Sequence, residues 1–251
     1  MSSIESWMGL SLVILFALLT LFFSAKKIRT RYPPVFRKIP AILRFRRAIG
    51  LAVEDGTRVG VSLGSSSLIE PSSPSSFVGL SALHRIGQLT STGDLPPIAT
   101  SGNGGLALLS QDVLRQTAVE TNTRELYDPS FAQLTGATPF SYAVGALEAM
   151  SEAGIKTNLF IGNFGPEAGF LCDASDQDQT FTLGASDSIT AQSIFYALSN
   201  EALIGEELYA LPAYLAYHPA HQTNLRVQDI FRVVVQVVLI AGALLKVLGL
   251  I

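Results

Sequence analysis

Residues 57–64, TRVGVSLG, form a short run rich in apolar and β-branched residues that ends at a glycine. Such a run, bounded by Gly56 on one side and by three serines on the other, predicts a buried β-strand. Residues 60–64 also match the G-x-S-x-G pattern, which in hydrolases places a nucleophilic serine at a strand-to-helix turn. Only three residues separate Gly56 from Gly60, whereas a typical strand has about five residues. We therefore expect Ser62 to lie inside the strand and not at a catalytic turn.

The same order of a strand-like run, small polar residues and a helical pattern recurs along the chain. The strand-like runs are TRVGVSLG (57–64), PPIATSG (96–102), KTNLFIG (156–162) and QTFTLG (179–184). Further helices are expected over 140–154 and 204–217. Strands that alternate with helices predict an α/β fold, in which a single domain is built on a mostly parallel sheet with flanking helices.

Two apolar segments flank this domain. Residues 6–25 carry no formal charge and would span about 30 Å as a helix, which is enough to cross a bilayer. The residues before them contain no Lys or Arg, unlike the start of a signal peptide. The second segment runs from Val233 to Ile251, and its Lys246 either pairs with Glu5 at the outer interface or faces headgroups there. We expect two transmembrane helices that tether the domain.

Basic residues follow the first segment with no acid among them. They are Lys26, Lys27, Arg29, Arg31, Arg37, Lys38, Arg44, Arg46 and Arg47. Because positively charged flanks stay in the cytoplasm, both termini are expected outside the cell membrane. The predicted organisation is an N-terminal anchor (1–25), a basic juxtamembrane collar (26–47), a cytoplasmic α/β head (48–225) and a C-terminal transmembrane helix (226–251).

Charge separates the collar from the head. From Arg37 to Arg47 the collar interleaves five basic residues with bulky apolar ones, a composition that favours an anionic lipid surface over nucleic acid. The head has five Lys or Arg against eighteen Asp or Glu, a formal charge of −13. An acidic head argues against nucleic acid as a partner, because nucleic-acid binding depends on basic side chains that neutralise phosphates.

Small polar residues gather where the predicted strands end. They are Gly64, Ser65 and Ser66 after the first strand, Ser101, Gly102, Asn103, Gly104 and Gly105 after the second, Asn163 after the third, and Ser186 and Asp187 after the fourth. Ligands of open parallel sheets bind at such ends, so these residues could hold a phosphate, a nucleotide or another anion. The alternative is that tight turns need these residue types, and the lack of a P-loop lysine favours this alternative.

Other combinations of reactive residues are incomplete. Ser62, Asp187 and His218 are the least unsuitable members of a Ser-His-Asp site, and His218 and His221 have no acid or cysteine near in sequence to complete a metal site. The acidic cluster at Asp173, Asp176 and Asp178 lacks the glycine and the glutamate of a calcium loop. The lone Cys172 fits a reducing compartment. We therefore expect no catalytic residue, no metal and no cofactor.

Several stretches resemble a family of uncharacterised bacterial membrane proteins, known only as a domain of unknown function and seen especially in Chloroflexota. They include AIGLAVEDGTRVGVSLGSSSL (48–68), ATSGNGGLALLSQDVLR (99–115), TGATPFSYAVGA (135–146) and LIGEELYALPAYLA (203–216). The resemblance covers nearly everything from Arg46 to Ile251. It implies a bacterial inner-membrane protein and carries no activity and no binding residues.

Two classes of function remain open. The first is a non-enzymatic module, anchored in the membrane, whose head self-associates or docks other membrane proteins as part of a homo-oligomeric assembly. The second is a sensor or enzyme that binds a nucleotide or another anion at the strand ends. The lack of any complete catalytic combination favours the first class.

Overall fold

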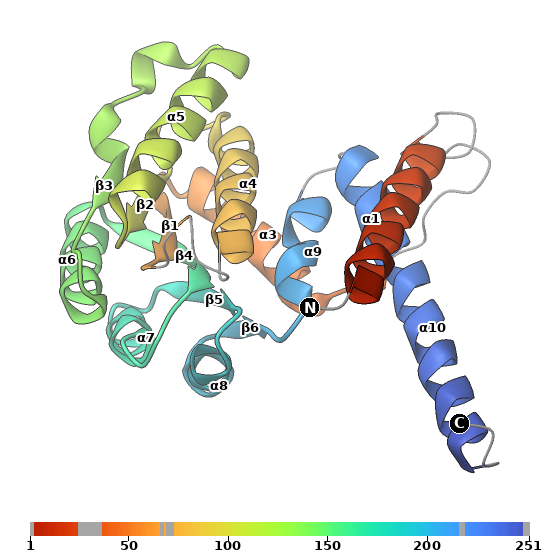
Figure 1. The fold of residues 1–251 in the computed structure, drawn as a ribbon. Helices are drawn as coiled ribbons and strands as arrows, with labels where there is room; N and C mark the ends of the chain where they lie inside the picture. The colour runs from red at the N-terminus through yellow and green to blue at the C-terminus, as the bar shows by residue number, and fades with distance from the viewer. Residues whose placement is uncertain (1–2, 25–36, 66–67, 69–72, 216–218, 248–251) are drawn as a thin grey trace. The chain divides into compact units, whose positions relative to one another are not determined.

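The computed structural model describes residues 3–24, 37–65, 68, 73–215 and 219–247, which belong to two compact units (Figure 1). The first, called here the α/β unit, comprises Lys38–Ala216. The second, called here the helical unit, comprises Met1–Arg37 together with Tyr217–Ile251.

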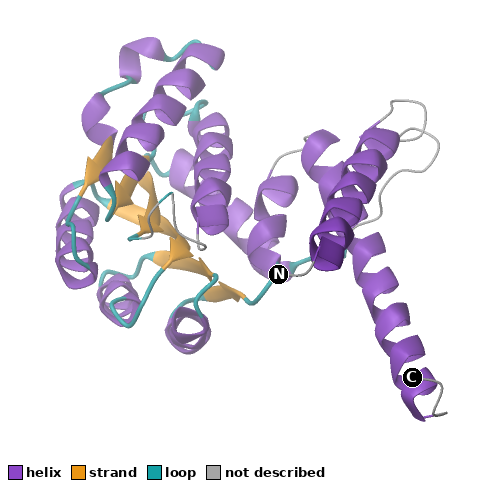
Figure 2. Cartoon of the chain, viewed as in Figure 1, coloured by secondary structure: helices purple, strands orange, loops and turns teal. Residues whose placement is uncertain are grey.

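The α/β unit is built on one sheet of six strands, all parallel (Figure 2). The strand order is β3-β2-β1-β4-β5-β6. The strands are β1 (Arg58–Gly64), β2 (Ile98–Ser101), β3 (Ala132–Leu134), β4 (Ile155–Asn163), β5 (Phe181–Ser186) and β6 (Glu201–Leu203). The prediction of an α/β fold with a parallel sheet and flanking helices is therefore confirmed. Ser62 lies inside β1, as the spacing of the glycines predicted.

Helices cover both faces of the sheet (Figure 1). The aliphatic face packs against α3 (Pro40–Glu54), α4 (Ser73–Thr90), α5 (Gly104–Glu120) and α9 (Glu207–Leu215). The aromatic face packs against α6 (Pro139–Glu152), α7 (Ala168–Gln177) and α8 (Ile189–Leu198). Two short 3₁₀ helices, η1 (Arg124–Leu126) and η2 (Pro129–Phe131), connect α5 to β3.

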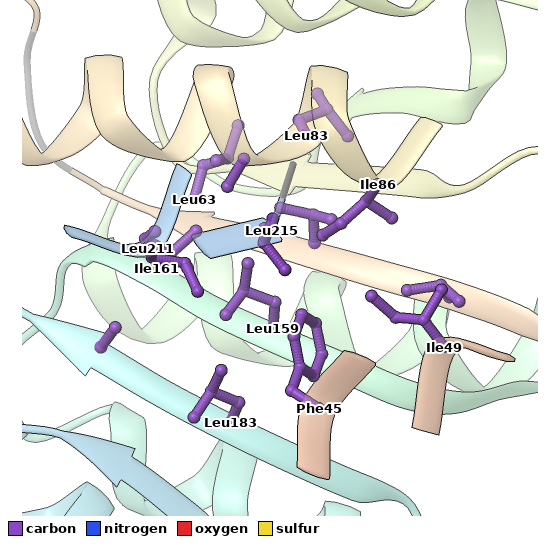
Figure 3. Close-up of a cluster of buried hydrophobic side chains, with 14 of the residues drawn as sticks. Phe45, Ile49, Leu63, Leu83, Ile86, Leu159, Ile161, Leu183, Leu211 and Leu215 are labelled. Atoms are coloured by element: carbon purple, nitrogen blue, oxygen red, sulfur yellow. The ribbon is translucent and has the colours of Figure 1, made fainter. Parts of the chain in front are cut away.

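The core of the aliphatic face explains the role of α3. Phe45 and Ile49 of α3 lie with Leu159 of β4 and Leu211 of α9 in one buried cluster (Figure 3). The predicted boundary at residue 47 between collar and head therefore divides a helix of the α/β unit. Hydrophobic contact with the sheet buries the apolar side of this helix. Its Arg44 remains exposed and donates a hydrogen bond to Glu201 of β6, at 3.1 Å.

In the helical unit, two helices pack antiparallel. They are α1 (Ser3–Ser24) and α10 (Pro219–Val247). The Phe16 and Phe231 ring centroids lie 5.6 Å apart, and the Arg226 guanidinium lies 4.7 Å from the Phe23 ring centroid. Residue numbers therefore increase along α1 in the direction in which they decrease along α10, so the two helices run antiparallel.

Among the described residues, one helical stretch is long and apolar enough to cross a membrane, judged by length and composition. It is Leu225–Leu244, within α10. The apolar part of α1, Gly9–Phe23, is shorter than the about 20 residues that a span needs. The prediction of two transmembrane helices is therefore not confirmed, and one candidate span is found.

Candidate functional site

Four of the predicted loops lie at one edge of the sheet, called here the strand-end edge. They follow β1, β2, β4 and β5, whose carboxyl ends share this edge because the strands are parallel. In the strand order, β2 and β3 follow β1 on one side, whereas β5 and β6 follow β4 on the other side. Ligands of open parallel sheets bind outside the strand ends at such a switch in direction. The strand-end edge is therefore the candidate site.

The loops after β1 and β4 are in backbone contact. The Ser65 N–H donates a hydrogen bond to the Asn163 carbonyl oxygen, at 3.2 Å. Gly64 has a φ of +74°, and a Cβ there would lie 2.2 Å from the same oxygen. A Cβ at Gly162 would lie 2.3 Å from the Leu63 carbonyl oxygen. Both positions therefore require glycine. Because β1 and β4 remain paired up to their ends, a ligand would have to lie outside these loops and not between the two strands.

A buried polar cluster lies directly below this contact. The Tyr142 hydroxyl accepts a hydrogen bond from the Gly64 N–H, at 3.2 Å, and the Thr100 hydroxyl donates to Ser62 Oγ, at 3.1 Å. Burial raises the pKa of Tyr142 to about 12. Ser62 is 1% exposed, so it is not accessible as a nucleophile. Of the other predicted members of that triad, Asp187 follows β5 and accepts a hydrogen bond from the Asn163 side chain, and His218 is outside the described residues.

The loop after β2 leads directly into α5. The Asn103 side chain accepts a hydrogen bond from the Leu106 N–H, at 3.2 Å, and so caps the helix. The Gly102 N–H donates to the Gly64 carbonyl oxygen, at 2.8 Å, which joins this loop to the first one. Gly104 and Gly105 are exposed, and no side chain of their own covers the amides in the first turn of the helix. This exposed first turn is the part of the loop where the helix dipole would favour an anion.

The loops after β4 and β5 bind to one another. The Asn163 side-chain amide donates to Asp187 Oδ1, at 2.8 Å. Ser186 Oγ accepts from the Ser188 N–H, at 3.2 Å. Burial, and secondly the Asp187 charge, raise the pKa of Tyr209. The Ser101 hydroxyl donates to the Asn103 carbonyl oxygen, at 3.3 Å. The side chains of Ser101, Asn163 and Ser186 thus stabilise the loops of this edge. Ser66, also predicted for this site, is outside the described residues.

Glu167 is a feature of this edge that the sequence analysis missed as a site residue. It is 0% exposed, and its Oε1 accepts a hydrogen bond from the Gly165 N–H, at 2.7 Å. Its Oε2 has no hydrogen-bond partner. In the sequence, Pro166 and Glu167 are typical of a helix start, and nothing in that pattern shows that the carboxylate turns back onto its own loop.

Cys172 and the acidic residues Asp173 and Asp176 lie on α7, and Asp178 caps the C-terminus of this helix. Burial raises the pKa of the Cys172 thiol to about 12, which makes the thiol a poor nucleophile. Within the described part of the chain, no three His, Cys, Asp or Glu side chains group closely enough to hold a metal ion.

A sequence-family model described as a domain of unknown function, DUF6754, matches residues 2–251. The chain belongs to this family. No curated protein and no solved structure matches it. The DUF6754 match thus covers both units, and it assigns no activity to the strand-end edge of this family member.

Proposed function

We propose that this DUF6754 chain is a non-enzymatic interaction module of a bacterial inner membrane, in which α10 is the anchor. The stretch Leu225–Leu244 carries this proposal. Its most apolar window of 18 residues has a mean hydropathy of 1.8, and only 6% of that window is buried in the protein. As a helix the whole stretch is about 30 Å long, the thickness of the hydrocarbon core of a bilayer. Water would solvate such a surface at a high cost in free energy, whereas lipid chains would not.

The strand-end edge supports an interaction role over catalysis. Its polar side chains bond to neighbouring loops, Ser62 is buried, and the Cys172 thiol is held in its neutral form. A nucleophile needs a general base within hydrogen-bond reach and access to substrate. The described residues of this edge do not combine these features.

In the proposed topology the head faces the cytoplasm. The basic residues between Lys26 and Arg47 support it, because such clusters remain on the cytoplasmic side. The antiparallel packing of α1 against α10 supports a two-pass arrangement with both termini outside. The exposed basic side chains of the collar, such as Arg46 and Arg47, would face anionic lipid.

Alkaline carbonate extraction tests the anchor. The full chain should stay in the membrane pellet, and the double variant V235R/L239R should leave it, because each mid-bilayer arginine costs about 2.5 to 3.5 kcal/mol. Gln116→Arg, on the exposed side of α5, is the matched control and should stay in the pellet. Wild-type protein in the soluble fraction would exclude membrane anchoring.

Cysteine labelling tests the topology. Cys172 is the one cysteine in the sequence and is buried, so an introduced cysteine gives a clean signal. A membrane-impermeant maleimide should label Lys246→Cys in intact cells, and should label Gln116→Cys only after permeabilisation. The reverse pattern would place the head outside.

A second candidate function is anion binding at the strand-end edge. The exposed glycines at the start of α5, beside the switch in strand order, favour it. A thermal-shift screen with nucleotides and phosphorylated metabolites should then find a stabilising ligand, and Gly104→Val should abolish that shift. Nothing lies within 4 Å of a Cβ at either Gly104 or Gly169, so Gly169→Val in α7 is a matched control that should retain it.

A further inference from the structure

Helix α3 has two sides of different chemistry. Its buried side carries Phe45 and Ile49 into the aliphatic cluster (Figure 3). Its exposed side follows the i, i+3, i+4, i+7, i+8 spacing of one helix face. The members of this exposed side, called here the α3 face, are Leu43, Arg46, Arg47, Gly50 and Leu51. Leu43 is 53% exposed and Leu51 is 51% exposed, so the face presents two apolar side chains beside two guanidinium groups.

The guanidinium groups of the α3 face have no counter-charge among the described residues. Arg44, a neighbour on the same helix, forms an ion pair with Glu201 of β6. Within the part of the chain that the structure describes, neither Arg46 nor Arg47 forms a hydrogen bond or an ion pair. The same holds there for Lys38, which is exposed just before the helix. Three basic groups within residues 38–47 are therefore available to an external anion.

The rest of the α/β unit has the opposite charge. Residues 56–215 contain five Lys or Arg against sixteen Asp or Glu, a formal charge of −11. Helix α3 contains three arginines and one glutamate. Such an asymmetric charge distribution turns α3 toward an anionic surface and holds the acidic remainder of the unit away from it. The charge distribution therefore selects an anionic partner for the α3 face.

The connections of the α/β unit keep a bilayer within reach of α3. Fifteen residues separate α1 from α3, and nine residues separate α9 from the candidate span Leu225–Leu244. Even fully extended, these connections reach no more than about 50 Å and about 30 Å. If α10 is anchored as proposed, the membrane surface is present at a high effective concentration beside the head. No other anionic partner has this advantage.

We propose that the α3 face docks the head onto the anionic leaflet of the bilayer that holds α10. Arg46 and Arg47 bind lipid phosphates, and Leu43 and Leu51 enter the boundary between headgroups and acyl chains. Nucleic acid and the acidic head of a second copy also carry anions, but neither offers a continuous apolar layer for the two leucines. The inference rests on the proposed function, since the anchor supplies the bilayer.

Docking through α3 determines the orientation of the whole head. The helix is part of the folded α/β unit, because its other side is buried against the aliphatic face of the sheet. A docked head therefore has the aliphatic face toward the bilayer and the aromatic face, with α6, α7 and α8, away from it. The strand-end edge then stays open to the aqueous phase.

Fluorescence quenching in proteoliposomes of the full chain tests this inference. Leu43→Cys carries an environment-sensitive dye, and Cys172 does not compete for the label because it is buried. Spin-labelled phosphatidylcholine should quench the dye in bilayers that contain one-third phosphatidylglycerol, and should not quench it in bilayers of phosphatidylcholine alone. Val144→Cys on α6 is the matched control, because Val144 is 67% exposed but lies on the aromatic face. Its dye should remain unquenched in both bilayers.

Removal of the two charges tests the role of the arginines. R46Q/R47Q in the Leu43→Cys background should lower the ratio of docked to free heads roughly 30-fold, because each basic residue near an anionic surface contributes about equally to binding. Its melting temperature should not change, since both side chains are exposed. Salt gives the same test without a substitution: 1 M NaCl should release the head, because it screens exposed charges.

Each failure has a separate signature. Equal quenching in anionic and neutral bilayers, no quenching in either, or equal quenching of Val144→Cys would overturn the inference. A change of the Leu43→Cys dye in lipid-free detergent that grows with protein concentration would overturn it in favour of a second acidic head. R46Q/R47Q should remain in the carbonate pellet, because docking and anchoring are separate contacts. Wild-type protein in the soluble fraction thus contradicts the anchor, whereas an unquenched dye on pelleted protein contradicts docking.

Discussion

The two faces of the central sheet are built differently. On the aliphatic face, α3, α4 and α9 contact one another as well as the strands, and they bury a continuous cluster of aliphatic side chains around Phe45 (Figure 3). On the aromatic face, α6, α7 and α8 surround Phe160, Phe164 and Phe195, whose rings lie within 6.3 Å of one another.

Buried polar atoms without a hydrogen-bond partner distinguish the aromatic face within the described residues. These atoms are Asn158 Oδ1 and Glu167 Oε2, and both belong to residues beside this face. The exposed Tyr196 and the exposed pair Phe140 and Phe170, with centroids 5.9 Å apart, lie on its helices. The comparison teaches that the aromatic face and its strand-end edge contain buried polar groups that stability alone does not require.

The largest expected effect is on the aliphatic face. Phe45→Ala removes a ring that is 0% exposed, and we expect it to lower the free energy of unfolding by about 3 to 5 kcal/mol. The melting temperature of the detergent-solubilised chain measures the loss. Arg46→Ala, one residue further along the same helix but exposed, should change the stability by less than about 0.5 kcal/mol. Equal, small effects of both variants would show that α3 is a peripheral collar helix.

The next effect concerns the backbone contact that joins the two halves of the sheet. Gly64→Ala forces a Cβ to within 2.2 Å of the Asn163 carbonyl oxygen at a φ of +74°, and should cost at least about 2 kcal/mol. Gly104→Ala meets nothing within 4 Å and should stabilise the chain by up to about 1 kcal/mol, since alanine favours helix. Thermal melts compare the two variants. A tolerated Gly64→Ala would show that the β1 and β4 loops separate in solution.

The sequence was sufficient to predict the strands that carry buried, β-branched runs. It predicted β1, β2, β4 and β5 together with their parallel arrangement, because each run ends in small residues before a helical pattern. It did not predict β3 and β6, which have three residues each and contain neither β-branched nor aromatic side chains. Such short edge strands form through pairing with β2 and β5 and leave no pattern of their own.

The candidate site was predicted only in part for a similar reason. The residue types Gly, Ser and Asn locate the strand ends in the sequence. No sequence pattern locates a side chain that reaches the site from a distant helix. Tyr142 reaches Gly64 across 78 residues of sequence, and α3 reaches the sheet from a segment that reads as basic and membrane-associated. Such contacts depend on tertiary packing, which periodicity within one segment does not encode.

Glu167 offers a smaller perturbation of the aromatic face. Glu167→Gln keeps an acceptor for the Gly165 N–H and removes an unpaired carboxylate, so we expect unchanged or higher stability. Glu167→Ala leaves that N–H without its acceptor and should cost about 1 to 3 kcal/mol. Chemical denaturation of the two variants measures the difference. If Glu167→Gln is the more damaging variant, the carboxylate charge itself has a partner or a role.

A further expected effect is alkaline destabilisation through the same face. Burial raises the pKa of Tyr142 and of Cys172 to about 12 each, above their ordinary values of 10.0 and 9.0. The folded chain therefore retains protons that the unfolded chain releases, and stability should fall as pH rises above about 9, starting with the thiol. Melting temperatures from pH 8 to 11 measure this slope, and Cys172→Ala should flatten its lower part. The fully buried members of the aliphatic cluster around Phe45, among the described residues, include no ionisable group. A wild-type slope that is unchanged in Cys172→Ala and in Tyr142→Phe would therefore place the titrating groups outside the aromatic face.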